Sequence, residues 1–249
     1  MKKTLAMVAA SAIALAFPNI AAAQGDAAPL AEATAHQKLM QALSPEARRP
    51  TLFAAVMRDI EAGYRAEPAF VEIEAACPGT VDSIMTEFRD PMYRYFLLEE
   101  QALNSRLLPV LREHLSDEQA LEAAAFYSGE LGQKLMFSVA DNFTLRETVD
   151  SVANVEVAPG KNTSELAIDR DAMDRDSKRT AQGAVAALTA SEQEQIAAQI
   201  LGKKWFAIMR RISPEMARIR FEVANMTHDP DFEDQIIGIV EETLEKCEM

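Results

Sequence analysis

The sequence predicts an all-α fold, a helical bundle built from antiparallel hairpins. Apolar residues recur mainly at three- and four-residue spacing, which is the period of a helix with one buried face. Two such stripes are Leu52, Val56, Ile60 and Leu131, Leu135, Val139, Phe143. The chain has only nine glycines in 249 residues and is rich in strong helix formers. Runs that alternate as a strand would are rare, so we expect no sheet.

Prolines and capping residues divide these stripes into separate helices. Ser44-Pro45 precedes the first stripe, and Cys77-Pro78-Gly79 ends the segment that contains it. We expect a further helix to follow Pro91 and run through Leu107, and Pro109 to kink or shift it. Ser116, with Gln119 three residues later, predicts the capping box of the next helix.

A weak internal similarity flanks the loop that Pro159-Gly160 predicts. Residues 115–136 and 188–209 each consist of a capped short helix, a glycine break and a longer amphipathic helix. We expect two hairpin halves, over about 81–150 and 164–246, as pseudo-repeats within one all-helical domain of residues 31–249. Chance likeness between amphipathic helices is the alternative explanation.

Residues 1–23 have the three parts of a secretory signal peptide. Lys2 and Lys3 precede an apolar run from Leu5 to Phe17, and Ala21-Ala22-Ala23 follows it. The run is shorter than the roughly 20 residues that a membrane-spanning helix needs. We expect cleavage after Ala23, a disordered leader over residues 24–30, no integral membrane segment in the mature chain, and a periplasmic or secreted location.

The chain is acidic, with a formal net charge of −14 at pH 7. Removal of Lys2 and Lys3 would make it two units more negative. Such a field repels phosphate groups, and no stripe of lysine and arginine offsets it, so nucleic acid is not an expected partner. An acidic balance is also what ordinary solubility requires.

Two cysteines, Cys77 and Cys247, lie far apart in the chain. In an exported protein an even, minimal count favours one disulfide over two free thiols. In the chain-entropy model, closing so long a loop stabilises the fold by roughly 4 to 5 kcal/mol. We predict a Cys77–Cys247 disulfide that holds the C-terminal segment near residue 77.

A motif of moderate specificity begins with a leucine, a serine and an acidic residue, and continues with an aromatic pair, a serine, a glycine and a lysine. Its positions are Leu115, Ser116, Glu118, Phe126, Tyr127, Ser128, Gly132 and Lys134. Over about residues 95–150, the chain resembles the bacterial exported family called domain of unknown function 2059. The resemblance implies a helical periplasmic or secreted protein of unassigned activity. The C-terminal hairpin lies outside that pattern.

Two interpretations of this motif stay open. In the functional one, Tyr127, Ser128 and Lys134 line a small polar binding pocket where two hairpins meet. In the structural one, the motif is a packing corner in which Ser128 caps the next helix and Gly132 allows another helix to approach closely.

We expect no metal and no cofactor. His36, His114 and His228 have no second ligand at metal-binding spacing. The acidic segments 169–176 and 229–231 lack the central glycine and the terminal glutamate of a calcium-binding loop. We interpret the first as an exposed helix face on which Asp171 pairs with Arg175, and the second as the cap of the last helix.

Catalytic residues are not expected either. No nucleophile motif and no phosphate-binding loop occurs in the sequence. Glu99 and Glu100 are adjacent, so they diverge around a helix rather than converge as a catalytic pair. An enzyme is therefore the least favoured class.

Two hypotheses for the function remain. The first is a binding or interaction module of the periplasm, with a protein, a peptide or an apolar ligand in a groove between hairpins. The methionines motivate this hypothesis, because flexible thioethers suit adaptable surfaces. The hairpin halves contain Met136, Met209, Met216 and Met226. Ordinary filling of the core is the alternative explanation for them.

The second hypothesis is a self-associating structural protein of the envelope, such as a homodimer. Its exposed apolar face would be formed by Met92, Tyr93, Tyr95, Phe96, Leu97 and Leu98.

Overall fold

A computed structural model describes residues 33–44, 46–153, 169–226 and 230–247, and every regular element in these ranges is a helix. The predicted all-α class is therefore confirmed. The elements are α2 (Ala35–Leu43), the 3₁₀ helix η1 (Glu46–Arg48), α3 (Arg49–Ala66), α4 (Pro68–Ala76), α5 (Thr80–His114), α6 (Asp117–Ser128), α7 (Glu130–Asp141), α8 (Arg146–Ala153), α9 (Arg170–Ala186), α10 (Ala190–Ile200), α11 (Lys204–Met226) and α12 (Pro230–Cys247).

Several predicted features lie outside the described residues: the signal peptide, the leader 24–30, the loop at Pro159, His228 and Asp229. Among the helices that are described, none is both long and apolar enough to cross a membrane.

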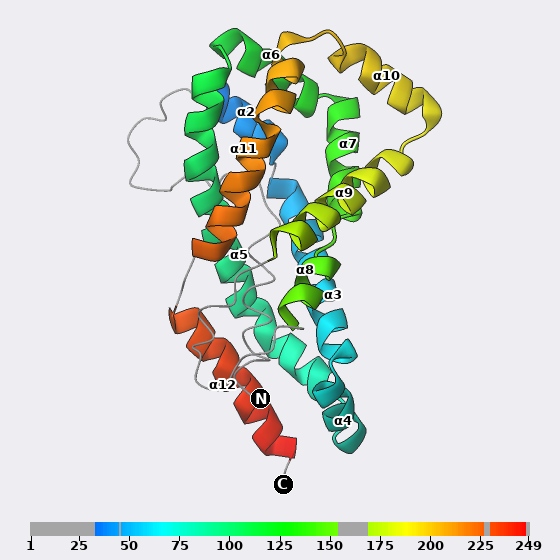
Figure 1. The fold of residues 1–249 in the computed structure, drawn as a ribbon, viewed down its shortest axis with the longest axis vertical. Coiled ribbons are helices and arrows are strands. Elements are labelled where there is room, and N and C mark those ends of the chain that lie inside the picture. The colour runs from blue at the N-terminus through cyan, green and yellow to red at the C-terminus, as the bar shows by residue number, and fades with distance from the viewer. Residues whose placement is uncertain (1–32, 45, 154–168, 227–229, 248–249) are drawn as a thin grey trace.

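The 35-residue helix α5 is the long axis of the bundle (Figure 1). Its first half packs against α3, α4 and α12, and its second half packs against α2 and α11. Pro91 and Pro109 both lie inside α5, so the prediction of a separate helix after Pro91 is wrong. Each proline removes one backbone N–H donor, and burial of α5 against its neighbouring helices offsets that loss.

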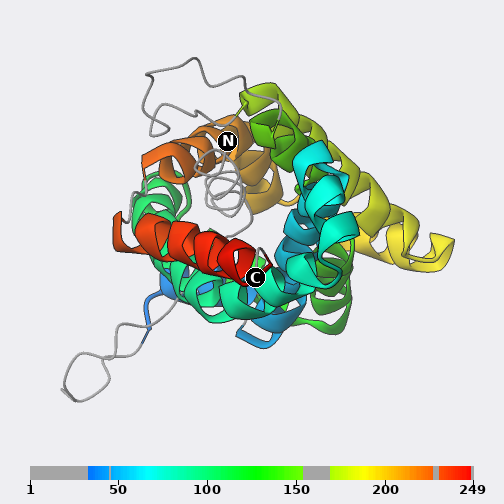
Figure 2. The ribbon, with the colours of Figure 1, turned by 90° about the horizontal axis from the view of Figure 1, so that it is seen from below.

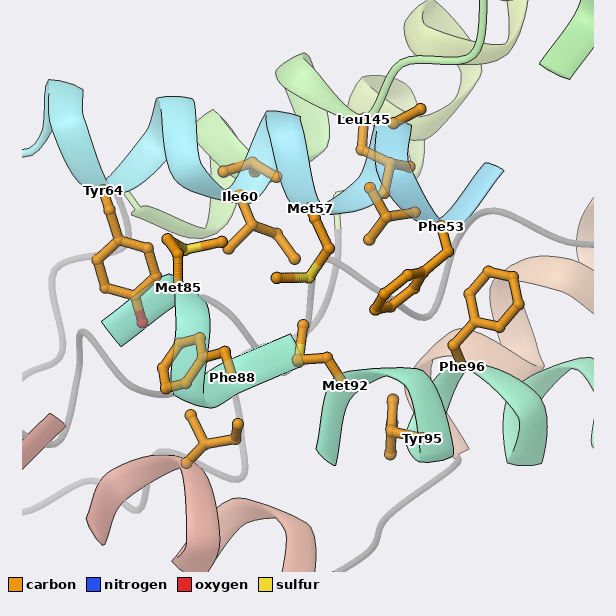
Figure 3. Close-up of a cluster of buried hydrophobic side chains, with 14 of the residues drawn as sticks. Phe53, Met57, Ile60, Tyr64, Met85, Phe88, Met92, Tyr95, Phe96 and Leu145 are labelled. Atoms are coloured by element: carbon orange, nitrogen blue, oxygen red, sulfur yellow. The ribbon is translucent and has the colours of Figure 1, made fainter. Parts of the chain in front are cut away.

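The apolar side chains form two clusters, one along each half of α5. The first joins α3, α4 and α12 to α5, and it contains the predicted stripe Leu52, Val56 and Ile60. Figure 3 shows Phe53, Met57 and Ile60 of α3 pointing towards Met85, Phe88 and Met92 of α5. The second cluster joins α2, α6 and α11 around Trp205.

The apolar face proposed for self-association is mostly part of the first cluster. Met92 and Phe96 are fully buried, and the Tyr95 ring stacks on Phe232 of α12 with 4.3 Å between centroids. Only Tyr93 and Leu98 of that set are exposed. Most of this face is therefore not exposed, because α3 and α12 cover its centre.

The two similar segments share their local structure. Ser116 and Thr189 begin α6 and α10 with capping boxes closed by Gln119 and Glu192, so the capping prediction at Ser116 is confirmed. In three dimensions the copies differ. Helix α6 packs against both α7 and α11, whereas α10 contacts α7 and projects from the side of the bundle (Figure 2).

The predicted disulfide between Cys77 and Cys247 is present. It links the end of α4 to the last residue of α12, and the two Cα atoms are 5.8 Å apart, a normal separation for a disulfide. The C-terminal helix is thus fixed at its far end as well as along its apolar stripe.

Gly132 is the tightest point of the α6–α7 corner. A Cβ atom at this position would lie 2.1 Å from the carbonyl oxygen of Phe126 and 2.7 Å from the Cα of Tyr127. The predicted close helix approach at Gly132 is therefore confirmed. The predicted cap is wrong, because Gly129 occupies the N-cap of α7 and no side chain caps this helix.

Substituting Gly132 with alanine is expected to lower the free energy of unfolding by about 2–3 kcal/mol, because backbone atoms cannot yield as a side chain can. Gly238 is the matched control: it lies inside α12, and nothing lies within 4 Å of a Cβ built there. Gly238→Ala should be neutral or stabilising by up to about 1 kcal/mol. Urea unfolding of both variants measures the difference, and equal effects would contradict the packing argument.

Candidate functional site

A cavity of about 200 Å³ lies between α7, α8, α9 and α11. Figure 1 shows α9 crossing α7 and beginning next to α8, and α11 adds Arg220 to the lining. The lining residues are Met136, Val139, Phe143, Thr144, Leu145, Thr148, Met173, Asp176, Ser177, Thr180, Ala181 and Arg220. An engineered apolar cavity of about 150 Å³ already admits benzene, so this one has room for a small organic molecule.

One wall of the cavity is apolar. Met136 and Val139 come from α7, Phe143 follows that helix, and Met173 comes from α9. Phe143 and Met173 are buried, whereas Met136 and Val139 are half-buried. Val139 and Phe143 belong to the second predicted stripe, and these two of its four members line the cavity.

The polar wall is the connection from α7 to α8. Asp59 of α3 holds its first part, since its Oδ2 accepts hydrogen bonds from the Thr144 hydroxyl at 2.9 Å and the Leu145 N–H at 2.7 Å. Arg58 donates to the Phe143 carbonyl at 2.8 Å and also pairs with Asp59. These bonds fix the backbone that lines the cavity.

Asp176 of α9 holds the start of α8, which it caps from a neighbouring helix. Its carboxylate accepts hydrogen bonds from the N–H groups of Glu147 and Thr148 at 3.1 and 2.9 Å, and from the Thr148 hydroxyl at 2.8 Å. These are N–H groups of the first helical turn, which otherwise lack partners. Burial raises the pKa of Asp176, and the hydrogen bonds from Thr148 and Glu147 oppose that shift.

Arg220 of α11 brings a positive charge to the cavity. Its Nε is buried, and within the described part of the chain it has no hydrogen-bond partner and no ion-paired carboxylate. Burial lowers the pKa of this guanidinium. The Arg220 side chain as a whole is half-buried, and a guanidinium partly removed from water without an ion pair is unfavourable. Among the described arginines, Arg48 also has a buried Nε without a partner, but its Nη2 donates to the Leu43 carbonyl.

Unlike Arg220, the charged residues on either side of it on α11 form ion pairs. Arg218 pairs with Glu222, and the same carboxylate also binds Arg106 of α5 at 2.6 Å. Burial opposes the effect of these two arginines on Glu222, whose pKa is nonetheless lowered. Glu222 is thus already engaged by two other cations.

The predicted site residues lie elsewhere. Tyr127 is half-buried, and its ring lies edge-on to Trp205 with 5.9 Å between centroids; burial raises the pKa of its phenol. Ser128 is exposed. Lys134 is also exposed and makes an ion pair with Glu192 of α10. None of the three lines the cavity beside α8.

The Lys134–Glu192 pair joins the two similar segments. Glu192 closes the capping box of α10 by accepting from the Thr189 N–H at 2.9 Å. The Lys134 ammonium and the donors of Thr189 lower the pKa of Glu192 to about 2. Lys134 thus contacts the start of α10, which supports the packing interpretation of the motif.

The other polar residues singled out in the sequence have structural contacts. His36 is buried and lies 2.9 Å from the Leu115 carbonyl, and His114 is 3.5 Å from Glu215. Arg175 contacts Glu147 and Asp169, so the predicted Asp171–Arg175 pair is replaced by other partners. Among the residues whose placement is described, no group of histidine, cysteine and acidic side chains could hold a metal ion.

The sequence pattern did not identify Asp176 and Arg220 as site residues. A signal for Asp176 existed, because it lies in the buried stripe of α9 that runs through Ala172, Met173, Asp176, Thr180 and Ala184. A charged residue on a buried stripe is informative. Arg220 follows Ile219 at the edge of the α11 stripe, and its position in a cavity depends on how α7, α9 and α11 come together.

No family model, curated protein or solved structure matches the chain. The resemblance to domain of unknown function 2059 stays a prediction.

Proposed function

We propose that this protein is a periplasmic binding module that takes a small organic molecule into the cavity between α7, α8, α9 and α11. The observation that carries the proposal is the lining of the cavity. The lining combines apolar side chains with polar groups held in place by Asp59 and Asp176, and such a combination is typical of ligand sites.

The compartment is part of the proposal. The pattern of residues 1–23 supports export, and so does the Cys77–Cys247 disulfide, because disulfides persist in oxidising compartments. The self-association hypothesis has less support, because α3 and α12 cover most of the apolar face on which it depends.

Titration with benzamide, a neutral probe somewhat larger than benzene, tests the proposal. With ¹³C-methyl-labelled methionine, the signals of Met136 and Met173 should shift saturably, because both side chains line the cavity. The signal of Met40, buried in the second apolar cluster, should not move. Equal shifts of all three, or no saturable shift of any, would contradict a ligand cavity.

A filled cavity provides the matched variant. Val139→Phe places a ring in the cavity and is expected to abolish the benzamide shifts while the protein stays folded. Val185→Phe makes the same change at an exposed valine of α9 outside the lining, and it should leave the shifts unchanged. Retained binding by the Val139 variant would place the ligand somewhere else.

A further inference from the structure

We infer that the ligand of this cavity carries a carboxylate, which pairs with the guanidinium of Arg220. The inference rests on the proposed function and names the chemical class of the ligand. It depends on three features of the cavity: a cation without an ion pair, the engagement of the nearby acids in other contacts, and the apolar part of the lining.

The first feature is the guanidinium of Arg220. Arg220 lines the cavity, its Nε is buried, and in the described ranges of the chain nothing accepts a hydrogen bond from that Nε. A guanidinium presents donors in a planar fork that matches the two oxygens of a carboxylate. A bound anion would therefore supply the partner that the fold does not.

The neighbouring acids are committed to other groups. Asp176 lines the same cavity, but both of its oxygens accept hydrogen bonds from residues at the start of α8. Glu222, two residues after Arg220 on α11, pairs with Arg218 and Arg106. Neither carboxylate forms an ion pair with Arg220, so the positive charge remains available to a ligand.

The remaining lining limits the rest of the ligand. Met136, Val139, Phe143 and Met173 offer an apolar surface, which an inorganic anion would leave without contacts. Thr180 accepts a hydrogen bond from the Thr144 N–H at 3.3 Å, and its hydroxyl hydrogen can still be donated to an anion. A small carboxylate with an aromatic or short aliphatic body satisfies both walls.

The negative net charge of the chain does not prevent an anionic ligand from pairing with Arg220 inside the cavity. The formal charge of −14 is spread over the whole sequence, and salt at physiological strength screens exposed charges beyond about 8 Å. An ion pair inside a cavity is screened much less. The local cation therefore governs selectivity, and the distant acids mainly slow the approach of an anion.

Benzoate and benzamide test the inference, because they have nearly the same size and shape and differ in charge. Hydrogen bonds to a charged group contribute about 1.5–3 kcal/mol, so benzoate should bind roughly tenfold to a hundredfold more tightly than benzamide. Inorganic phosphate, added at the same concentrations, should not shift the Met136 and Met173 signals.

Arg220→Met is expected to remove the preference for benzoate while benzamide still binds. Arg218→Met is the matched control, since Arg218 lies on the same helix, is exposed and lies outside the lining; this variant should keep the preference. If Arg220→Met does not fold, Arg220→Lys, which keeps the charge, should retain part of the preference.

The possible failures are distinguishable. Equal affinity of the unmodified protein for benzoate and benzamide overturns the role of Arg220 and leaves the proposed cavity standing. Loss of the preference in Arg218→Met as well as in Arg220→Met would show an effect of overall charge, and it also overturns the inference. Binding of neither organic probe contradicts the proposed function itself.

Discussion

Replacing Cys77 and Cys247 together by serine is expected to lower the free energy of unfolding by about 5 kcal/mol. The two cysteines are separated by 170 positions in the sequence. In the chain-entropy model, a cross-link that closes so long a loop removes much of the conformational freedom of the unfolded chain. Residual structure in that chain makes the figure an upper value. Urea unfolding of the parent and the double variant, both without reductant, measures the loss.

The packing of α12 supplies a control for this experiment. Phe232, Ile236, Val240 and Leu244 recur every four residues and are buried in the same cluster as the first half of α5. We therefore expect α12 to remain docked in the folded variant, with slowed hydrogen exchange at its amides. An unchanged urea midpoint would mean that the disulfide contributes no stability. Loss of protection confined to α12 would mean that the bond, and not the apolar stripe, holds the helix.

The features predicted correctly from the sequence depend on short segments. The stripe Leu52, Val56 and Ile60 is buried because the helical period alone puts these residues on one face. The capping box at Ser116 needs only Gln119 three residues later. The disulfide followed from a count of two cysteines, because only one intramolecular pairing exists.

The errors come from contacts between distant segments. Helix α5 continues through Pro91 because α3 and α12 bury it there, and neither neighbour is visible in the local sequence. The same neighbours cover Met92 and Phe96, which looked like a surplus apolar face. In both cases tertiary packing overrode a correct local signal.

The candidate site was harder to predict for the same reason. The sequence predicts Tyr127, Ser128 and Lys134 as binding residues because they belong to one motif. The cavity instead collects residues from α7, α8, α9 and α11, and its cation, Arg220, belongs to no motif. No spacing rule links Arg220 to Asp176, since the two lie on different helices. Only the three-dimensional arrangement shows that the Nε of Arg220 is buried without a partner.

Glu99 and Glu100 show how a correct prediction can still miss the important property. They diverge as expected: Glu100 accepts a hydrogen bond from Arg49 at 3.1 Å, whereas Glu99 lies near Tyr95. Both are nevertheless buried, at the point of α5 where the first apolar cluster ends and the second begins. Burial raises the pKa of Glu99 well above its ordinary range, and Tyr95 opposes only part of that shift.

The same effect acts on Glu100. Burial raises the pKa of this carboxyl to about 7, although Arg49 opposes the shift. In the unfolded chain the pKa returns to its ordinary value near 4.5. Between these two values the folded state binds more protons than the unfolded state, so the stability falls as the pH rises.

We therefore expect the free energy of unfolding to decrease by on the order of 3 kcal/mol between pH 4.5 and pH 7.5, from Glu100 alone. Glu100→Gln should remove this contribution, because an amide does not titrate; the decrease that remains comes from the other buried acids with raised pKa values, Glu99 among them. Glu113→Gln, at an exposed carboxyl of the same helix, should leave the profile of the parent unchanged. Urea unfolding at several pH values across this range provides the measurement. A stability that rises over the range in the parent, or an equal decrease in the Glu100 variant, would contradict the assignment.

Below pH 4.5 the free energy of unfolding is expected to fall as the pH falls, so the stability has a maximum as a function of pH. The pKa of Glu192 is lowered to about 2 by Lys134 and Thr189, so its contribution is present above pH 4.5 and disappears as the pH falls towards 2. Acids with raised and lowered pKa values thus limit the stability from opposite sides. We expect the maximum near pH 4.5, and Lys134→Met should weaken the acid limb only, because Lys134 contacts Glu192 and lies far along the chain from Glu100. If Lys134→Met changed the stability only above pH 4.5, the assignment of Glu192 to the acid side and of Glu100 to the alkaline side of the maximum would be contradicted.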